Sequence, residues 1–132
     1  MRNYDVILFD LDGTLTDSAP GILNSVRYAC RKLGLEMPSE ATLRKFLGPP
    51  LIDSFRTLAG LSDAEADHAV SAFREYFPTK GIFENEVYDG VPALLADLKA
   101  AGKTVIIATS KPEDFAKRIM AHFDLAQYCD FV

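Results

Sequence analysis

The stretch YDVILFDLDGT spans residues 4–14 and joins a short apolar run to two aspartates and a glycine. The run from Tyr4 to Asp10 has the length of a β-strand and is rich in Val, Ile and Phe. Runs of this kind are typical of strands that are buried on both faces, as in a parallel sheet. A second run of the same character, KTVIIAT, extends from Lys103 to Thr109. Together the two runs predict parallel strands of one α/β sheet.

The segment between the two runs has a helical pattern instead. From residue 17 to residue 88 the apolar residues recur with the 3.6-residue period of a helix, and Gly and Pro residues interrupt them. Ser62, with Glu65 three residues later, has the spacing of a capping box at a helix start. The segment therefore predicts four short amphipathic helices in a small bundle.

Two further helices are expected after this bundle, over residues 91–101 and 112–123, and Cys129–Val132 resembles the start of another strand. The order of elements predicts an α/β fold with a parallel-sheet core. We expect the core to comprise residues 1–16 and 89–132, and a helical domain over residues 17–88 to be inserted after the first strand.

Composition excludes several classes of function. The 14 Lys and Arg residues against 19 Asp and Glu residues give a net charge of −5, which disfavours nucleic acid and anionic membrane surfaces as partners. No apolar run approaches the roughly 20 residues that span a bilayer, and the N-terminus does not have the pattern of a signal peptide. Cys30 and Cys129 form no disulfide framework, so a reducing cytoplasm is the expected location.

The predicted core is small for its sheet. About three strands with two covering helices leave one face and one edge poorly covered, and some 60 residues are near the lower limit for an independent core. The sequence also ends at Asp130-Phe131-Val132, inside an apolar run. We therefore expect this sequence to be a piece of a longer α/β protein.

Asp10 and Asp12 carry the most specific chemical signal. Side chains alternate along a strand, so two aspartates two residues apart project to the same side, where their charges repel. A divalent cation relieves this repulsion, and hard oxygen ligands favour Mg²⁺. Gly13 lets the chain turn and is expected to leave backbone N–H groups facing the site. A calcium-binding loop is excluded, because its sixth and twelfth positions hold Leu15 and Gly21 instead of Gly and Glu.

Thr109 and Ser110 end the second predicted strand and precede a helix. Hydroxyl and N–H groups at such a position can hold an anion, although similar segments often only start helices. With Asp10 at the end of a neighbouring strand, a phosphate site becomes the better interpretation.

The chain resembles the haloacid dehalogenase superfamily of phosphatases, and within it the phosphoglycolate phosphatase-like branch. The resemblance lies in FDLDGTLTDS, the helical insertion, Tyr88-Asp89-Gly90-Val91 and IIATSKP. It implies a Rossmann-like core and a mobile four-helix cap. It also implies Asp10 as the nucleophile that forms an aspartyl-phosphate, Asp12 as general acid and base, and Thr109 as the residue that holds the phosphoryl group. Mg²⁺ would bind the Asp10 carboxylate and the Asp12 main-chain carbonyl.

The resemblance also shows a departure. The lysine and the acidic cluster that complete the family's site normally follow the position where this sequence ends, and Lys111 does not occupy the position of that lysine. The resemblance thus implies that the chain lacks the C-terminal half, and that this piece alone has an open metal site and little activity.

The inserted domain is expected to select the substrate. Gly48-Pro49-Pro50 resembles the family's substrate-specificity loop, although it can equally be a simple helix break. The cations Arg44, Lys45, Arg56 and Lys80 are either solvated surface charges or contacts for a substrate anion. The predicted hinges of the cap are Asp17-Ser18 and Asp89-Gly90.

The leading hypothesis is a Mg²⁺-dependent phosphatase of a small phosphorylated metabolite, such as phosphoglycolate, a nucleoside monophosphate or a sugar phosphate. A phosphomutase of the same superfamily is one alternative, and an inactive truncated domain that acts as a binding module is another. A dehalogenase is disfavoured, because that chemistry needs no leaving-group acid at Asp12. A homodimer or a complementing C-terminal segment remains open as the protein partner.

Overall fold

The computed structural model describes residues 4–132, which divide into two compact units. Unit 1 contains the residues up to Ser18 together with Asn85–Val132, and unit 2 contains Ala19–Glu84. Unit 2 is a few residues shorter at each end than the insertion expected over residues 17–88. The difference arises from two short strands, β2 (Thr16–Asp17) and β3 (Glu86–Val87), which pair antiparallel within unit 1. Strands of two residues have no periodicity that a sequence pattern could reveal.

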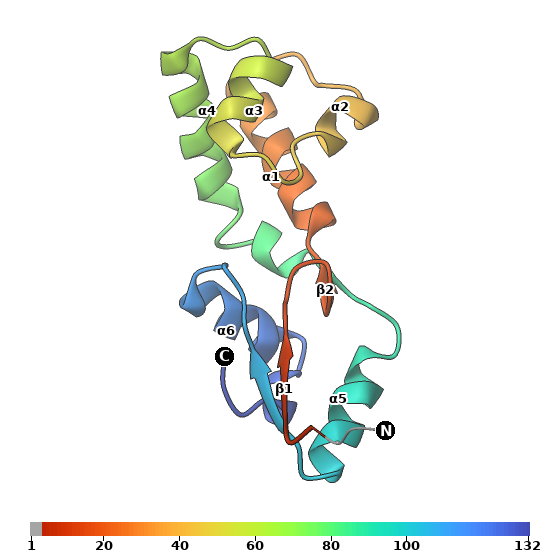
Figure 1. The fold of residues 1–132 in the computed structure, drawn as a ribbon. Helices are drawn as coiled ribbons and strands as arrows, with labels where there is room; N and C mark the ends of the chain where they lie inside the picture. The colour runs from red at the N-terminus through yellow and green to blue at the C-terminus, as the bar shows by residue number, and fades with distance from the viewer. Residues whose placement is uncertain (1–3) are drawn as a thin grey trace. The chain divides into compact units, whose positions relative to one another are not determined.

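The sheet of unit 1 has the parallel pairing that the sequence predicts. Strand β1 (Val6–Phe9) pairs with β4 (Thr104–Ile107), which is the blue arrow beside β1 in Figure 1. The register places Val6 opposite Thr104 and Phe9 opposite Ile107. Beyond β4, Phe131 forms a single parallel bridge with Ile106, at the position where a further strand start was expected. The carboxyl ends of β1 and β4 therefore lie at the same edge of the sheet.

The expectation that β1 is buried on both faces is wrong. Val6 is 52% exposed and Leu8 is 63% exposed, whereas Val105 and Ile107 of β4 are buried. The apolar run correctly predicts a strand, but an apolar residue is buried only if another element covers it. The two helices of unit 1 leave this face open, as the count of strands and helices suggests.

Helices start and end in unit 1 where glycine and proline indicate. Helix α5 (Val91–Ala100) follows Gly90, which has a left-handed φ of 83°, and carries Pro92 in its first turn. It packs against β4 and against the 3-10 helix η2 (Ala126–Tyr128). Helix α6 (Glu113–His122) follows β4 and buries Ala116, Ile119 and Met120.

Unit 2 is helical. It contains α1 (Ala19–Lys32), α2 (Glu40–Arg44), α3 (Leu51–Leu58), α4 (Asp63–Tyr76) and the 3-10 helix η1 (Gly81–Phe83). Helix α4 packs against α1 and α3, and η1 packs against α1. The predicted capping box is confirmed, because Ser62 and Glu65 bond each other's backbone N–H groups.

The core of unit 2 is built from aromatic and small side chains. The rings of Phe46 and Phe55 meet edge to face, with 5.1 Å between their centroids, and Ala66, Ala69 and Val26 pack around them. This arrangement lets the helices approach closely while large rings fill the space between them. Among the described residues, no helix is long and apolar enough to cross a membrane.

Candidate active site

The candidate site lies in unit 1, where β1 and β4 end. Asp10 directly follows β1, and the N–H of Ala108 donates to the carbonyl of Phe9 at 2.7 Å. This bond continues the parallel pairing by one residue beyond β4, so the chain enters Thr109 beside the end of β1. The register of the sheet therefore brings Asp10 and Thr109 to the same edge, as the sequence predicts.

A tight turn follows Asp10. The Oδ1 atom of Asp10 accepts a hydrogen bond from the N–H of Leu11 at 2.7 Å, which fixes the rotation of the carboxylate. The carbonyl of Leu11 then accepts the N–H groups of Thr14, Leu15 and Thr16. Leu11 and Leu15 are buried and anchor the turn, while Asp10 is exposed to solvent.

Gly13 provides the conformation of this turn. Its φ of 80° lies in the left-handed region that favours glycine, and a Cβ at this position would meet no atom within 4 Å. Its N–H donates to the carbonyl of Thr16 at 2.8 Å. The turn itself therefore uses the Gly13 N–H, while the expected role of Gly13 in holding a phosphate stays a prediction.

The two oxygens of the Asp12 carboxylate have different surroundings. Oδ2 lies 3.3 Å from the Nζ atom of Lys111, and this ion pair joins the turn after β1 to the segment after β4. Oδ1 is buried and has no hydrogen-bond partner among the described residues. The carboxylate is therefore held on one side and has an unsatisfied acceptor on the other.

Lys111 is the site residue that the sequence analysis missed. It lies two residues after Thr109, and its side chain is only 9% exposed. The motif IIATSKP contains Lys111, but the sequence analysis gave this lysine no role. The available signal was the parallel register, which brings the segment after β4 beside the DxD turn.

Thr109 has a defined orientation. Its Oγ1 atom accepts a hydrogen bond from the N–H of Lys111 at 3.1 Å. A hydroxyl that accepts one bond keeps its own proton as a donor, so Thr109 can still donate to an anion. Ser110 is exposed beside it, and α6 begins three residues later.

The oxygen atoms at this site fit Mg²⁺ in chemistry. Mg²⁺ in proteins commonly takes one or two carboxylates and completes its shell with water and substrate phosphate. Asp10 and Asp12 supply hard oxygens of this kind, and the unpartnered Oδ1 of Asp12 shows that the site is polar and incompletely satisfied. Over the described residues, no group of three or more His, Cys, Asp or Glu side chains is placed to hold a metal ion.

The predicted substrate-specificity loop belongs to unit 2. Gly48, Pro49 and Pro50 connect α2 to α3 and are exposed, with Gly48 at a φ of 108°. Of the four candidate cations, Arg56 pairs with Asp63 at 2.8 Å, and Lys80 lies over the ring of Tyr76. Arg44 and Lys45 are exposed.

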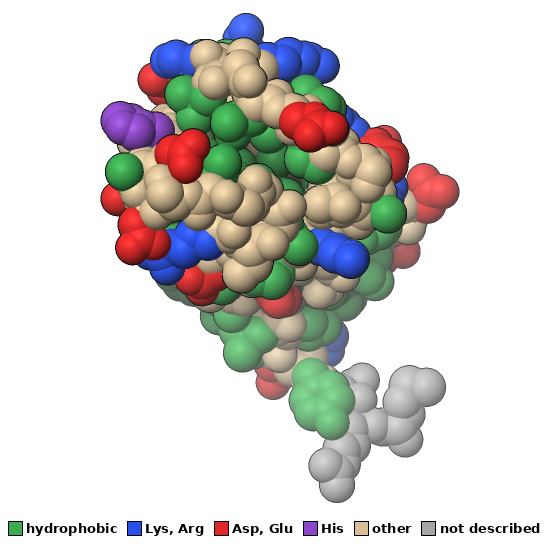
Figure 2. Space-filling view, turned by 90° about the horizontal axis from the view of Figure 1, so that it is seen from above, with side chains coloured by type: hydrophobic (Ala, Val, Ile, Leu, Met, Phe, Trp, Pro, Cys, Tyr) green, Lys and Arg blue, Asp and Glu red, His purple; other side chains and the backbone are tan. Residues whose placement is uncertain are grey.

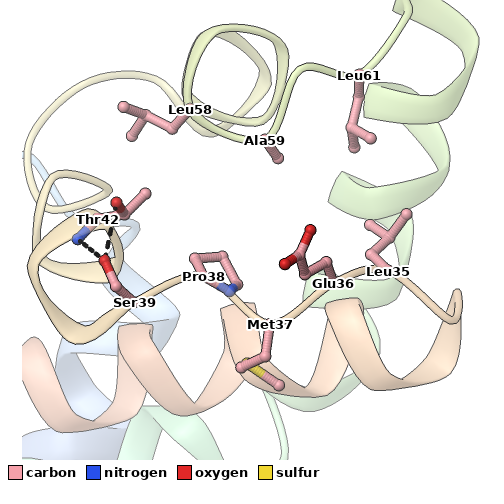
Figure 3. Close-up of a pocket in the computed structure, with 9 residues that line it drawn as sticks. All are labelled: Leu35, Glu36, Met37, Pro38, Ser39, Thr42, Leu58, Ala59 and Leu61. Carbon is pink, nitrogen blue, oxygen red and sulfur yellow. Dashed lines mark hydrogen bonds between the residues drawn. The ribbon is translucent and has the colours of Figure 1, made fainter.

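Unit 2 also contains a cavity of about 280 Å³ that no sequence motif indicates. It lies between the loop that follows α1 and the loop that joins α3 to α4 (Figure 3). Figure 2 looks onto this end of unit 2 and shows hydrophobic side chains in a hollow bordered by charged ones. The lining residues are Leu35, Glu36, Met37, Pro38, Ser39, Thr42, Leu58, Ala59 and Leu61. None of the predicted site residues lines it.

Comparisons with family models and with known proteins agree on the family of this chain. The model of the haloacid dehalogenase-like hydrolase family matches residues 7–132. A 5′-nucleotidase from Pseudomonas aeruginosa is 48% identical over 120 residues, which cover 91% of this chain and 54% of the nucleotidase. Phosphoglycolate phosphatase from Aquifex aeolicus is a further relative, at 30% identity. The match covers 96% of this chain and 59% of the phosphoglycolate phosphatase.

Solved structures share the fold. A crystal structure from Clostridium difficile has 42% identity and a TM-score of 0.93, and the match covers 99% of this chain and 60% of that one. Protein Tyrosine Kinase A from Mycobacterium tuberculosis has 39% identity and a TM-score of 0.76, over 96% of this chain and 58% of the kinase. The chain therefore spans a little over half the length of these relatives.

Proposed function

This chain belongs to the haloacid dehalogenase-like hydrolase family and is phosphoglycolate phosphatase-like, and on that premise we propose that it carries the nucleophile half of a Mg²⁺-dependent phosphatase site. In this proposal the substrate is a small phosphorylated metabolite, and the reaction passes through a phosphoryl group bound covalently to Asp10. The supporting observation is the meeting of Asp10, Asp12 and Thr109 at one edge of the β1–β4 sheet.

In the first step, a carboxylate oxygen of Asp10 attacks phosphorus. The new bond joins Asp10 to the phosphoryl group, and the bond from phosphorus to the leaving oxygen breaks. Asp12 donates its proton to that leaving oxygen, so the product departs as an alcohol. The Leu11 N–H restrains the rotation of the Asp10 carboxylate, and the Thr109 hydroxyl donates to a phosphoryl oxygen.

In the second step, the phosphoryl group is transferred to water. Asp12 is now a carboxylate and takes a proton from the water, whose oxygen forms a bond with phosphorus while the bond to Asp10 breaks. Asp10 and Asp12 are restored, and inorganic phosphate leaves. The Asp10 carboxylate and the Asp12 main-chain carbonyl would hold Mg²⁺, which would supply positive charge to offset the negative charge of the phosphoryl oxygens.

Three substrate classes follow from this proposal. The 5′-nucleotidase relative supports a nucleoside monophosphate, and the phosphoglycolate phosphatase relative supports phosphoglycolate. Sugar phosphates are the third class. We propose that the helical cap, with Gly48, Pro49 and Pro50 as its specificity loop, selects among them.

The decisive experiment measures phosphate release from all three classes, with Mg²⁺ and with excess EDTA. Phosphate release by the parent should be slow, because the chain carries only half of the proposed site, but it should require Mg²⁺, and Asp10→Asn should abolish it. Asp97→Asn is the matched control, because Asp97 is an exposed aspartate on α5. Mass spectrometry of acid-quenched samples should find the phosphoryl adduct on the peptide that contains Asp10. Parental activity in Asp10→Asn would refute the covalent mechanism.

A phosphomutase is the first alternative, because Asp12 can protonate and deprotonate a second substrate hydroxyl as well as water. The similarity to a tyrosine kinase also favours testing acceptors other than water. Analysis of products by phosphorus NMR separates these reactions: a phosphatase yields inorganic phosphate, and a transferase yields a new phosphate ester.

A binding module is the second alternative, and the open face of β1 favours it. Val6, Leu8 and Phe131 are large apolar residues that are all more than half exposed. If this face binds a second copy of the chain, the mass in solution should be that of a dimer, and Leu8→Asp should return it to a monomer. A complementing segment would instead leave the isolated chain monomeric.

A further inference from the structure

We infer that Lys111 is a positioning residue for Asp12, and that it neutralises the Asp12 carboxylate independently of any bound metal. The catalytic part of this inference rests on the proposed function. The electrostatic part concerns only the charges of the site and can be tested without turnover.

The ion pair between Lys111 and Asp12 differs from the other lysine ion pairs of unit 1. The side chain of Lys111 is 9% exposed, whereas Lys99, which pairs with Asp130, is 46% exposed, and Lys117, which pairs with Glu113, is 58% exposed. A lysine is rarely buried to this extent unless a charged partner is near. Exposed pairs contribute little because water screens them, but a buried cation needs its partner.

The backbone holds Lys111 in place together with Thr109. The N–H of Lys111 donates to Thr109 Oγ1, while its Nζ atom contacts Asp12 Oδ2. One three-residue segment after β4 thus orients the proposed phosphate-binding hydroxyl and the proposed acid–base carboxylate. Replacing the lysine side chain should disturb the carboxylate but leave the backbone bond to Thr109 intact.

The pairing also distinguishes the two oxygens of Asp12. Because Lys111 holds Oδ2, the buried and unpartnered Oδ1 is the oxygen left to carry the transferred proton. A carboxylate fixed in this way has one productive orientation. General acid–base catalysis depends on such placement and contributes typically about 10²–10⁴-fold.

The charge of Lys111 has a second consequence. When both are ionised, Asp10 and Asp12 bring two negative charges to the site, and the lysine offsets one of them. The ammonium group would repel a divalent cation bound by these carboxylates, and at a separation of about 4 Å such a charge alters binding several-fold even in water. Loss of Lys111 should therefore strengthen metal binding while it weakens catalysis, which loss of an ordinary structural residue would not do.

The first experiment measures Mn²⁺ affinity without substrate, by electron paramagnetic resonance at low salt. Lys111→Met should bind Mn²⁺ about 3–10-fold more tightly than the parent, whereas Lys111→Arg should match the parent. Lys99→Met removes a lysine of the same unit that pairs outside the site, and it should leave the affinity unchanged. Unchanged or weaker binding in Lys111→Met would overturn the electrostatic part.

The second experiment measures steady-state kinetics on the best substrate of the panel. Lys111→Met should lower kcat at least about 10-fold and change KM less than about threefold, and Lys111→Arg should recover most of kcat. A raised KM with an unchanged kcat would show instead that Lys111 binds substrate. If the parent itself has no activity, the proposed function fails, and the affinity experiment still decides the electrostatic part.

A third measurement tests the ion pair even if the parent binds no Mn²⁺ or a variant is too unstable for kinetics. In a double-mutant cycle, Asp12→Asn and Lys111→Gln should have non-additive effects on the free energy of unfolding, because each removes the same ion pair. Additive effects would show that the two side chains do not interact, and would overturn the inference irrespective of metal and activity.

Discussion

Gly81→Ala tests how η1 is packed in unit 2. A Cβ at position 81 would lie 2.5 Å from Ser25 Oγ, 2.8 Å from the carbonyl oxygen of Gly21 and 3.2 Å from the ring of Phe77. Ordinary contacts of a Cβ begin near 3.4 Å. Ser25 is buried and donates to the Gly21 carbonyl at 2.7 Å, so the two closest atoms are bonded to each other within α1.

The expected cost follows from which atoms can move. The Ser25 hydroxyl can rotate only by losing its hydrogen bond, and the Gly21 carbonyl moves only with the backbone of α1. Overpacking of this kind typically costs about 1–3 kcal/mol of unfolding free energy. The backbone of Gly81 is not in the left-handed region, so the cost is steric and no penalty for the conformation of alanine is added.

Urea unfolding followed by circular dichroism measures this cost, and hydrogen exchange locates it. Amides of α1 and α4 should lose protection, whereas those of β1 and β4 should keep it, because the contacts of Gly81 lie within unit 2. In a Ser25→Ala background the penalty of Gly81→Ala should be smaller, since one of the two closest contacts is gone. A Gly81→Ala variant within about 0.5 kcal/mol of the parent, or more stable than it, would refute this view of the packing.

Three further outcomes are expected. Ser62→Ala should lower the unfolding free energy by about 1 kcal/mol, measured by urea titration, because the capping box loses its hydroxyl acceptor; no change would mean that the N-terminus of α4 contributes little. The pKa of Asp130 lies below its usual value because Lys99 and the N–H of Val105 bond the carboxylate, so its contribution to stability is present above the unfolded pKa and is lost as the pH falls through the folded pKa. Asp130→Asn should therefore lower the melting temperature at pH 7 and match the parent in strong acid; an equal difference at both pH values would contradict this. Adding EDTA to the parent should abolish phosphate release, and adding Mg²⁺ should restore it; release that persists in EDTA would exclude a metal requirement.

Local signals in the sequence predict most of the elements of this fold. The apolar runs at residues 4–10 and 103–109 correspond to β1 and β4, and Ser62 caps α4 as its spacing indicates. These features depend on residues close together in the chain, so a pattern in one short window contains them. The placement of Asp10 and Thr109 at one edge also follows, because parallel strands have a common direction.

Features that depend on distant parts of the chain were not predictable in the same way. The exposure of Val6 and Leu8 depends on which elements cover β1, and an apolar run carries no information about its cover. Strands β2 and β3 pair with each other although all of unit 2 separates them in the sequence, and each strand is too short to show an alternating pattern. One local feature was not predictable either: the Gly13 N–H donates to the Thr16 carbonyl, and residue types alone do not specify this closure of the turn.

The ion pair between Lys111 and Asp12 is partly predictable from local patterns and partly dependent on distant residues. Asp12 and Lys111 are almost a hundred residues apart in the sequence, yet each lies a fixed number of residues after a strand. Once Phe9 is placed opposite Ile107, both strands end at the same edge of the sheet, so the segment that contains Lys111 lies beside the turn that contains Asp12. Alternation alone does not predict the ion pair, because it places Asp10 and Asp12 on the side of the sheet opposite to Phe9 and Ile107. Strand register therefore predicts that these two segments meet at one edge, whereas the pairing of Asp12 with Lys111 depends on the turn that follows Asp10.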